Sequence, residues 1–154
     1  MYELIRLFIL IACVAVISKG DEVDMCSLKS PESVVGKHLT LVARMGFTPH
    51  GMFVLTDKCP RKIPEALVMF PHDPGAPEVG FELAEGVFAA LKPYFRLTGG
   101  AATACGAIAG QFVSRRHFKA DSVGTMTQGN GFGPRGDFQF AFILQNVVEI
   151  RGCP

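Results

Sequence analysis

The chain has 154 residues, of which 49% are hydrophobic and 19% are charged, and its formal net charge at pH 7 is +1. This length supports one domain, and the apolar fraction is sufficient for a hydrophobic core. Because the charges nearly balance, the net charge supports neither a basic surface for nucleic acid nor an acidic tail.

The first residues of the chain predict a signal peptide. The apolar run at residues 7–17 is shorter than the ~20 residues needed to cross a membrane but matches a signal-peptide core. Small residues, Ser18 and Gly20, stand at the −3 and −1 positions if cleavage falls before Asp21. We therefore expect residues 1–20 to be removed on export to the periplasm or the extracellular space. A buried strand or helix is the alternative.

A second interpretation of the N-terminus is a lipoprotein. Residues 10–13 resemble the lipobox that precedes the acylated cysteine of bacterial lipoproteins. The apolar run continues past Cys13 to Ile17, however, so only a short hydrophobic core would remain before that cysteine. Acylation at Cys13 would anchor the chain to a membrane; without it we expect no membrane association.

Four cysteines remain after residues 1–20 are removed, namely Cys26, Cys59, Cys105 and Cys153. An even number in an exported chain favours disulfides, and the absence of a CxxC pair leaves zinc and thioredoxin-like motifs unsupported. Four cysteines allow three pairings. Because Cys26 precedes the first predicted strand and Cys59 follows the second, their bridge would close the open end of a hairpin, and Cys105 would pair with Cys153.

The clearest structural pattern is a β-hairpin within residues 36–60. Two alternating apolar runs are joined by a short polar link that contains Pro49, His50 and Gly51, which is the pattern of two antiparallel strands. The residues expected to share one face are Leu39, Leu41, Ala43 and Met45 in the first strand, and Phe53 and Leu55 in the second.

Three further strands and one helix are predicted after the hairpin. Helical spacing over residues 78–91 indicates a helix that Pro93 ends. Gly106 and Gly110 are expected to mark a bulge or a sharp bend in the fourth strand. The order strand–strand–strand–helix–strand–strand is that of the OB fold, so residues 21–154 are predicted to form one mainly β domain with one helix, an OB-like five-stranded Greek-key barrel. An open α+β sandwich is the alternative. The three later strands are expected at residues 66–70, 103–115 and 138–150.

Several short motifs resemble a loose group of uncharacterised bacterial exported proteins. The motifs are Cys26 before Pro31, Gly36-Lys37 at the opening of a strand, Asp57-Lys58-Cys59-Pro60 at the end of the hairpin, Gly110-Gln111-Phe112, and the stretch Gly131-Phe132-Gly133. The resemblance covers most of the mature chain. It implies an OB-like β-barrel outside the cytoplasm and implies no activity.

The sequence contains no motif that predicts a catalytic residue, a cofactor or a metal. Residues 131–136 match the string GxGxxG, but a dinucleotide site needs a strand before it and a helix after it, and here a strand follows. No histidine stands at a metal-ligand spacing from another histidine or a cysteine, and no serine has a nucleophile-elbow context. We therefore interpret these residues as loops and solvated side chains.

A short basic patch is the candidate ligand site. It consists of Arg115, Arg116, His117, Phe118 and Lys119, and Lys37 and Arg44 could extend it. OB barrels bind oligonucleotides and oligosaccharides through their second and third strands and the neighbouring loops, and basic groups beside an aromatic ring suit an anionic polymer. Exported proteins rarely meet nucleic acid, so we expect an anionic glycan or another envelope protein as partner. A solvated face is the alternative.

These observations favour a non-catalytic exported binding or structural module of the OB type. The alternative is a secreted hydrolase or a metal-dependent enzyme whose residues meet only in the folded chain. A convergent cluster of His, Asp or Glu side chains in a pocket would support the enzyme, whereas polar residues scattered over the barrel would support the module.

Overall fold

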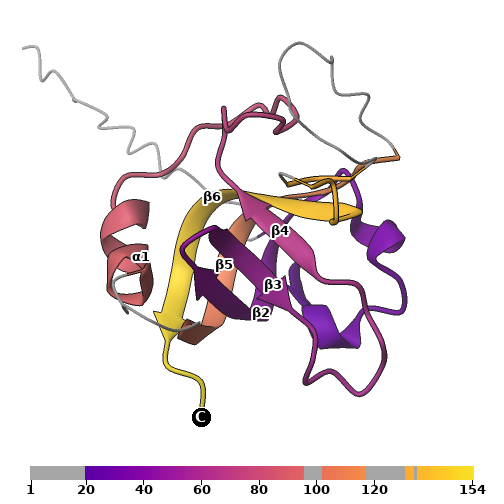
Figure 1. Cartoon of the computed structure of the whole chain (residues 1–154), viewed down its shortest axis with the longest axis horizontal. Helices are drawn as coiled ribbons and strands as arrows, with labels where there is room; N and C mark the ends of the chain where they lie inside the picture. Colours follow the sequence, from indigo (N-terminus) through magenta and orange to yellow (C-terminus); the bar gives the residue numbers. More distant parts are fainter. Residues whose placement is uncertain (1–19, 96–101, 117–130, 134) are drawn as a thin grey trace, which may run out of the picture.

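The structure, a computed structural model, describes residues 20–95, 102–116, 131–133 and 135–154 (Figure 1). Within these ranges the elements are, in chain order, β1 (Glu22–Asp24), the 3₁₀ helices η1 (Met25–Ser27) and η2 (Pro31–Val34), β2 (His38–Thr48), β3 (Gly51–Leu55), β4 (Ala66–Met69), α1 (Val87–Phe95), β5 (Ala102–Ser114) and β6 (Phe140–Arg151).

Strands β2, β3, β4, β6 and β5 close into a barrel in that order, because β5 pairs with β2 along most of its length. The β4–β6 pair is parallel and the other barrel pairs are antiparallel. Together with a helix between the third and fourth barrel strands, this confirms the predicted mainly β fold with an OB-like barrel. Strand β1 was not predicted, and it pairs in parallel with the start of β2.

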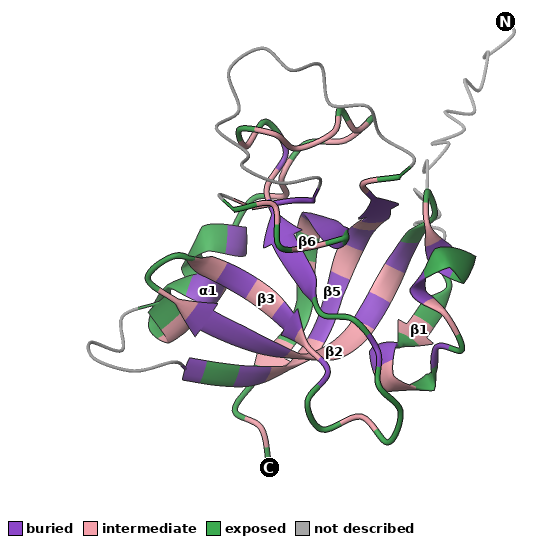
Figure 2. Cartoon of the chain, turned by 45° about the vertical axis from the view of Figure 1, so that its right-hand side comes forward, coloured by how far each residue is buried: buried purple, intermediate pink, exposed green. Residues whose placement is uncertain are grey.

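The main core fills the barrel. Buried and less buried residues alternate at the start of β2 and along β3 (Figure 2), as expected for strands with one face inward, whereas residues 45–47 near the end of β2 are all buried and Ala43 is half-buried. In β3 the buried side chains are Met52 and Val54, so Phe53 and Leu55 share a face as predicted, but it is the outer one. Helix α1 adds Val87 and Leu91 to the same core.

Helix α1 differs from the prediction in its bounds. It spans Val87–Phe95 and contains Pro93, whereas the spacing predicted a helix over residues 78–91 that Pro93 would end. Gly86 has a φ of +85° just before the helix, a conformation that glycine adopts without the cost an L side chain would carry. The residues before it are not helical; there the amide of Ala84 donates to the Gln145 carbonyl over 2.8 Å.

A second, smaller hydrophobic cluster lies on the outer face of the barrel. It contains Leu67, Met69, Val113, Phe132, Ala141 and Ile143, with Val79, Phe81 and Phe138 among the partly buried residues packed against it. All four residues of β4 are therefore buried, two toward each cluster. A strand covered on both faces explains why this segment is continuously apolar and not alternating.

Two disulfides join Cys26 to Cys59 and Cys105 to Cys153, with Cα–Cα distances of 5.0 and 4.9 Å. Both predicted pairings are confirmed. They fit an oxidising location outside the cytoplasm, where disulfides persist. In the described part of the chain, no helix combines the length and the apolar character required to cross a membrane.

Candidate functional site: a groove across strand β4

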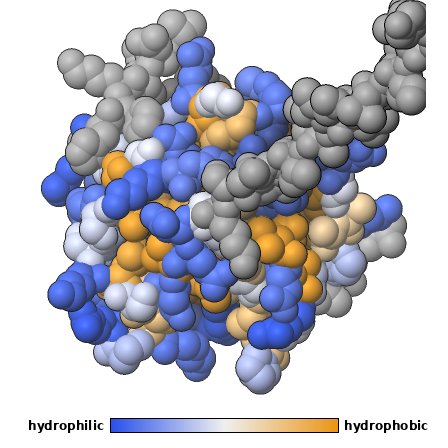
Figure 3. Space-filling model, turned by 180° about the vertical axis from the view of Figure 1, so that it is seen from behind, coloured by the Kyte–Doolittle hydropathy of each residue, from blue (hydrophilic) through white to orange (hydrophobic). Residues whose placement is uncertain are grey.

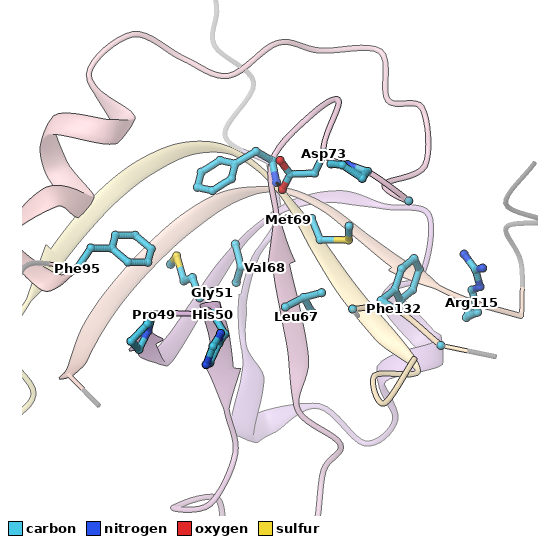
Figure 4. A pocket seen from close by; sticks show the side chains of 16 residues that line it. Pro49, His50, Gly51, Leu67, Val68, Met69, Asp73, Phe95, Arg115 and Phe132 are labelled. Atoms are coloured by element: carbon cyan, nitrogen blue, oxygen red, sulfur yellow. Dashed lines mark hydrogen bonds between the residues drawn. The ribbon is translucent and has the colours of Figure 1, made fainter. Parts of the chain in front are cut away.

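A groove of about 680 Å³ lies across β4 (Figure 4). We call it the β4 groove, and its lining includes Leu67, Val68 and Met69 of that strand. In Figure 4, Phe95 lies at one end, and Arg115 lies beside Phe132 at the other. The volume falls within the range of roughly 300–1,000 Å³ that is typical of small-molecule sites.

Two turns border the β4 groove. On one side is the β2–β3 turn, where the His50 amide donates to the Thr48 hydroxyl over 3.1 Å and Gly51 has a φ of +147°. On the other side is the turn after β4, where the Asp73 carboxylate accepts a hydrogen bond of 2.8 Å from the Phe70 amide. That bond satisfies one oxygen of a half-buried carboxylate.

The Arg115 end of the groove is built where β5 finishes. The backbone amide of Arg115 donates to the Gln139 carbonyl over 3.0 Å, and Phe132 pairs with Phe138 in an isolated bridge. The guanidinium carbon of Arg115 lies 5.6 Å from the centre of the Phe132 ring, within the range of a cation–π contact. Phe132 itself is 2% exposed, so this cation rests on an apolar support.

Arg115 has no carboxylate partner among the described residues. The ion pairs found there join Arg44 to Asp57, His72 to Glu82, and Arg151 to Glu149. Arg115 is half-buried, so its charge is only partly compensated by water.

The predicted basic patch is only partly placed by the structure. Arg115 lines the β4 groove, and Arg116 is exposed beyond the end of β5, outside the groove lining. His117, Phe118 and Lys119 lie outside the described residues. Of the two cations expected to extend the patch, Lys37 is exposed before β2, and Arg44 lines a different cavity.

That second cavity, of about 390 Å³, lies beside both disulfides and is lined by charged residues of both signs. Its Arg44 hydrogen-bonds the Asp57 carboxylate over 2.5 Å, and this bond holds the pKa of Asp57 below its ordinary value of 3.8. Because Arg44 is engaged in this pair, we do not assign it to a ligand site.

Exposed apolar side chains are few among the described residues. The large ones are Phe88, Phe95 and Val148, at 65%, 44% and 58% exposed. Phe95 lines the β4 groove, and the ring of Phe88 lies 5.2 Å from that of Phe70, tilted by 38°, and Phe70 also lines the groove. On the side of the molecule shown in Figure 3, hydrophilic side chains divide the apolar surface into separate areas. Through Phe95 and Phe70, the exposed aromatic side chains of α1 adjoin the β4 groove.

The groove is formed largely by segments that were predicted to be loops. The link at residues 49–51, the proline-rich residues 71–77 and the glycine-rich residues 131–136 all contribute to it, as does the end of α1. One general rule could have pointed to these segments: OB proteins bind ligands through their second and third barrel strands. The third barrel strand here is β4, which is recognisable in the sequence as a short, continuously apolar run.

The ionisable side chains that line the groove come from separate segments, the β2–β3 turn, the turn after β4 and the end of β5. His50 lies beside β4 in the β2–β3 turn, whereas Asp73 lies beyond the end of β4 (Figure 4), where its carboxylate is already hydrogen-bonded to backbone. No group of three His, Cys, Asp or Glu residues that could hold a metal ion is found in the described ranges. This arrangement suits non-covalent binding.

Comparisons with protein-family models, with curated proteins and with solved structures found no match to this chain. A functional proposal must therefore rest on the chemistry of the β4 groove.

Proposed function

We propose that this chain is a non-catalytic, exported bacterial binding module that takes its ligand in the β4 groove. The observation that carries the proposal is the groove itself, a concave and mostly apolar site with a few polar groups at its edges. That composition is typical of ligand sites in which apolar contact supplies affinity and a few polar groups set orientation.

The separation of acid and base groups supports a binding role over a hydrolytic one. A hydrolase that uses one group as general acid and another as general base needs both within hydrogen-bond reach of the reacting atoms, directly or through one water. His50 and Asp73 occupy opposite borders of the groove. The polar side chains of the groove are thus scattered, which is the pattern expected of a module.

Export is supported by two independent features. The apolar run at residues 7–17 matches a signal-peptide core, and two disulfides staple a small barrel, as in many secreted domains. The periplasm or the extracellular space is the corresponding compartment.

The export proposal predicts the mass of the mature protein. When the full chain is expressed in a bacterium with an intact export pathway, we expect the mass of residues 21–154, less the hydrogens lost on forming both disulfides. The measurement is intact-protein mass spectrometry without reductant. A full-length chain with free thiols would contradict export, and an acylated product that starts at Cys13 would contradict cleavage before Asp21.

The binding proposal predicts that a neutral apolar probe binds the β4 groove. N-phenyl-1-naphthylamine should show a saturable rise in fluorescence with the wild-type protein. Phe95→Asp should weaken this binding about tenfold or more, because a carboxylate would then be desolvated at the apolar end of the groove. The measurement is a fluorescence titration, with circular dichroism to establish that the variant is folded.

Val148→Asp is the matched control, because Val148 is also a large exposed apolar residue but lies outside the groove lining. Its affinity for the probe should stay within about twofold of wild type, as expected for a surface substitution remote from the site. Equal losses in the two variants, or the lack of saturable binding by wild type, would refute the groove as the binding site.

A further inference from the structure

We infer that the β4 groove selects a soluble single-chain amphiphile with one anionic group, which pairs with Arg115 while the apolar body lies across β4 toward Phe95. This inference rests on the proposed function, since it names the ligand class for the same groove. An anionic amphiphile thus replaces the anionic glycan that was expected from the sequence; both ligands carry a negative charge.

The lining of the groove disfavours a glycan. Leu67, Val68 and Met69 offer no side-chain hydrogen-bonding groups, and Phe70 and Phe95 extend the apolar surface. A sugar has a hydroxyl on most of its carbons, and each hydroxyl that loses water without a new partner weakens binding. An aliphatic or aromatic body has no such requirement and gains by leaving water.

The charges of the groove define an orientation. Arg115 lies at one end and has no carboxylate partner among the described residues, while the Asp73 carboxylate lies just beyond the end of β4, away from Arg115 (Figure 4). An anion at Arg115 would form a charge-assisted hydrogen bond on a partly desolvated guanidinium. An anion placed beside Phe70 would instead approach the Asp73 carboxylate, which is bonded to the Phe70 amide.

The opposite end of the groove suits the apolar part of such a ligand. The Phe95 ring is 44% exposed there, and the Phe70 ring lies 5.2 Å from that of Phe88, which is 65% exposed. The carboxylate nearest to these rings is that of Asp73, which accepts a hydrogen bond from the Phe70 amide and would repel an anionic group. A chain that starts at Arg115 can therefore extend across β4 with its apolar end toward these rings.

A free amphiphile fits better than a lipid within a bilayer. The β4 groove is bordered on both sides by turns, the one at His50 and the one at Asp73 (Figure 4). A lipid would have to leave its membrane to lie between them, whereas a soluble molecule enters directly. We therefore commit to the soluble form.

Displacement of bound N-phenyl-1-naphthylamine tests the inference. Decanoate and decyltrimethylammonium, which carry opposite charges on chains of similar length, are titrated at pH 7.5 below their micelle-forming concentrations. On the wild-type protein, the concentration of decanoate that displaces the probe should be about tenfold lower than that of decyltrimethylammonium. This is the effect expected of one charge-assisted hydrogen bond. On Arg115→Gln, this preference should fall to about twofold or less, measured as the ratio of the two displacing concentrations on the same variant.

Arg116→Gln is the matched control, because Arg116 is a neighbouring arginine that is exposed and lies outside the groove lining. It should keep the full preference for decanoate. Equal displacement by the two amphiphiles on wild type, or an unchanged preference in Arg115→Gln, would overturn the inference while leaving the groove as a binding site. Failure of the neutral probe to bind wild type would instead refute the proposed function. Binding to phosphatidylglycerol vesicles without displacement by decanoate would overturn the inference in favour of a membrane ligand.

Discussion

Reduction of both disulfides should lower the free energy of unfolding by about 8 kcal/mol, roughly 4 kcal/mol for each bridge, on the chain-entropy relation for loop closure. The bridges join cysteines 33 and 48 residues apart, so each restricts a long stretch of the unfolded chain. Domains of this kind have about 5–15 kcal/mol of stability in total. We therefore expect the reduced protein to be marginally stable or unfolded, as measured by urea titration with and without reductant.

Variants that each lack one disulfide measure how much of this loss of stability each bridge accounts for. Cys26→Ser with Cys59→Ser, and Cys105→Ser with Cys153→Ser, should each lose about half of the total, the second slightly more because its loop is longer. A urea midpoint that does not change after complete reduction, verified by thiol counting, would contradict the prediction. It would also remove the stability argument that ties this fold to an oxidising compartment.

The strands and the disulfides could be predicted from sequence because their signals are local. Leu39 and Leu41 alternate with polar neighbours, so they indicate one buried face. Once the hairpin is placed, Cys26 and Cys59 lie on the two sides of its open end and can form a bridge. Cys105 and Cys153 are then the two cysteines that remain to be paired. Each of these steps needs only the order of residues along the chain.

The helix bounds could not be predicted in this way, because its neighbours satisfy two patterns at once. Val79 and Phe81 fit the helical spacing that leads to Val87, but their two-residue separation also fits an extended segment with one face buried. In the structure they pack against the outer cluster on β4 and β6. Only the presence of that cluster distinguishes the two patterns, and it is formed by residues distant in sequence.

The β4 groove shows the same limit more strongly. Arg115 was found because charge is visible in sequence. Phe95 and Phe132 were not, since each looks like any other apolar residue next to a loop. They lie at the two ends of one groove because the barrel places the end of α1 and the segment before β6 on either side of β4. That placement is a property of the topology.

Gly110→Ala should destabilise the protein by about 3 kcal/mol or more, as expected when a methyl group is forced into space already filled by backbone. The ladder between β5 and β6 shifts register between Ala109 and Gly110, and a Cβ atom built on Gly110 would overlap the carbonyl oxygen of Ile143. The extra residue at this shift, Gln145, belongs to β6 and lies opposite Gly110, whereas the sequence predicted the bulge in the strand of the glycines itself. Because the obstacle is backbone, relief requires the two strands to separate. The measurement is the urea midpoint of the oxidised protein.

Gly80→Ala provides the matched control. Gly80 is exposed, and no atom lies within 4 Å of a Cβ built on it. Alanine there should change stability by no more than about 0.5 kcal/mol, or raise it slightly by restricting the unfolded chain. Similar midpoints for the two variants would mean that β5 and β6 do not approach as closely as the barrel requires. Since β6 also pairs with β4, such a result would equally weaken the geometry of the β4 groove, because the floor of the groove depends on the same closure.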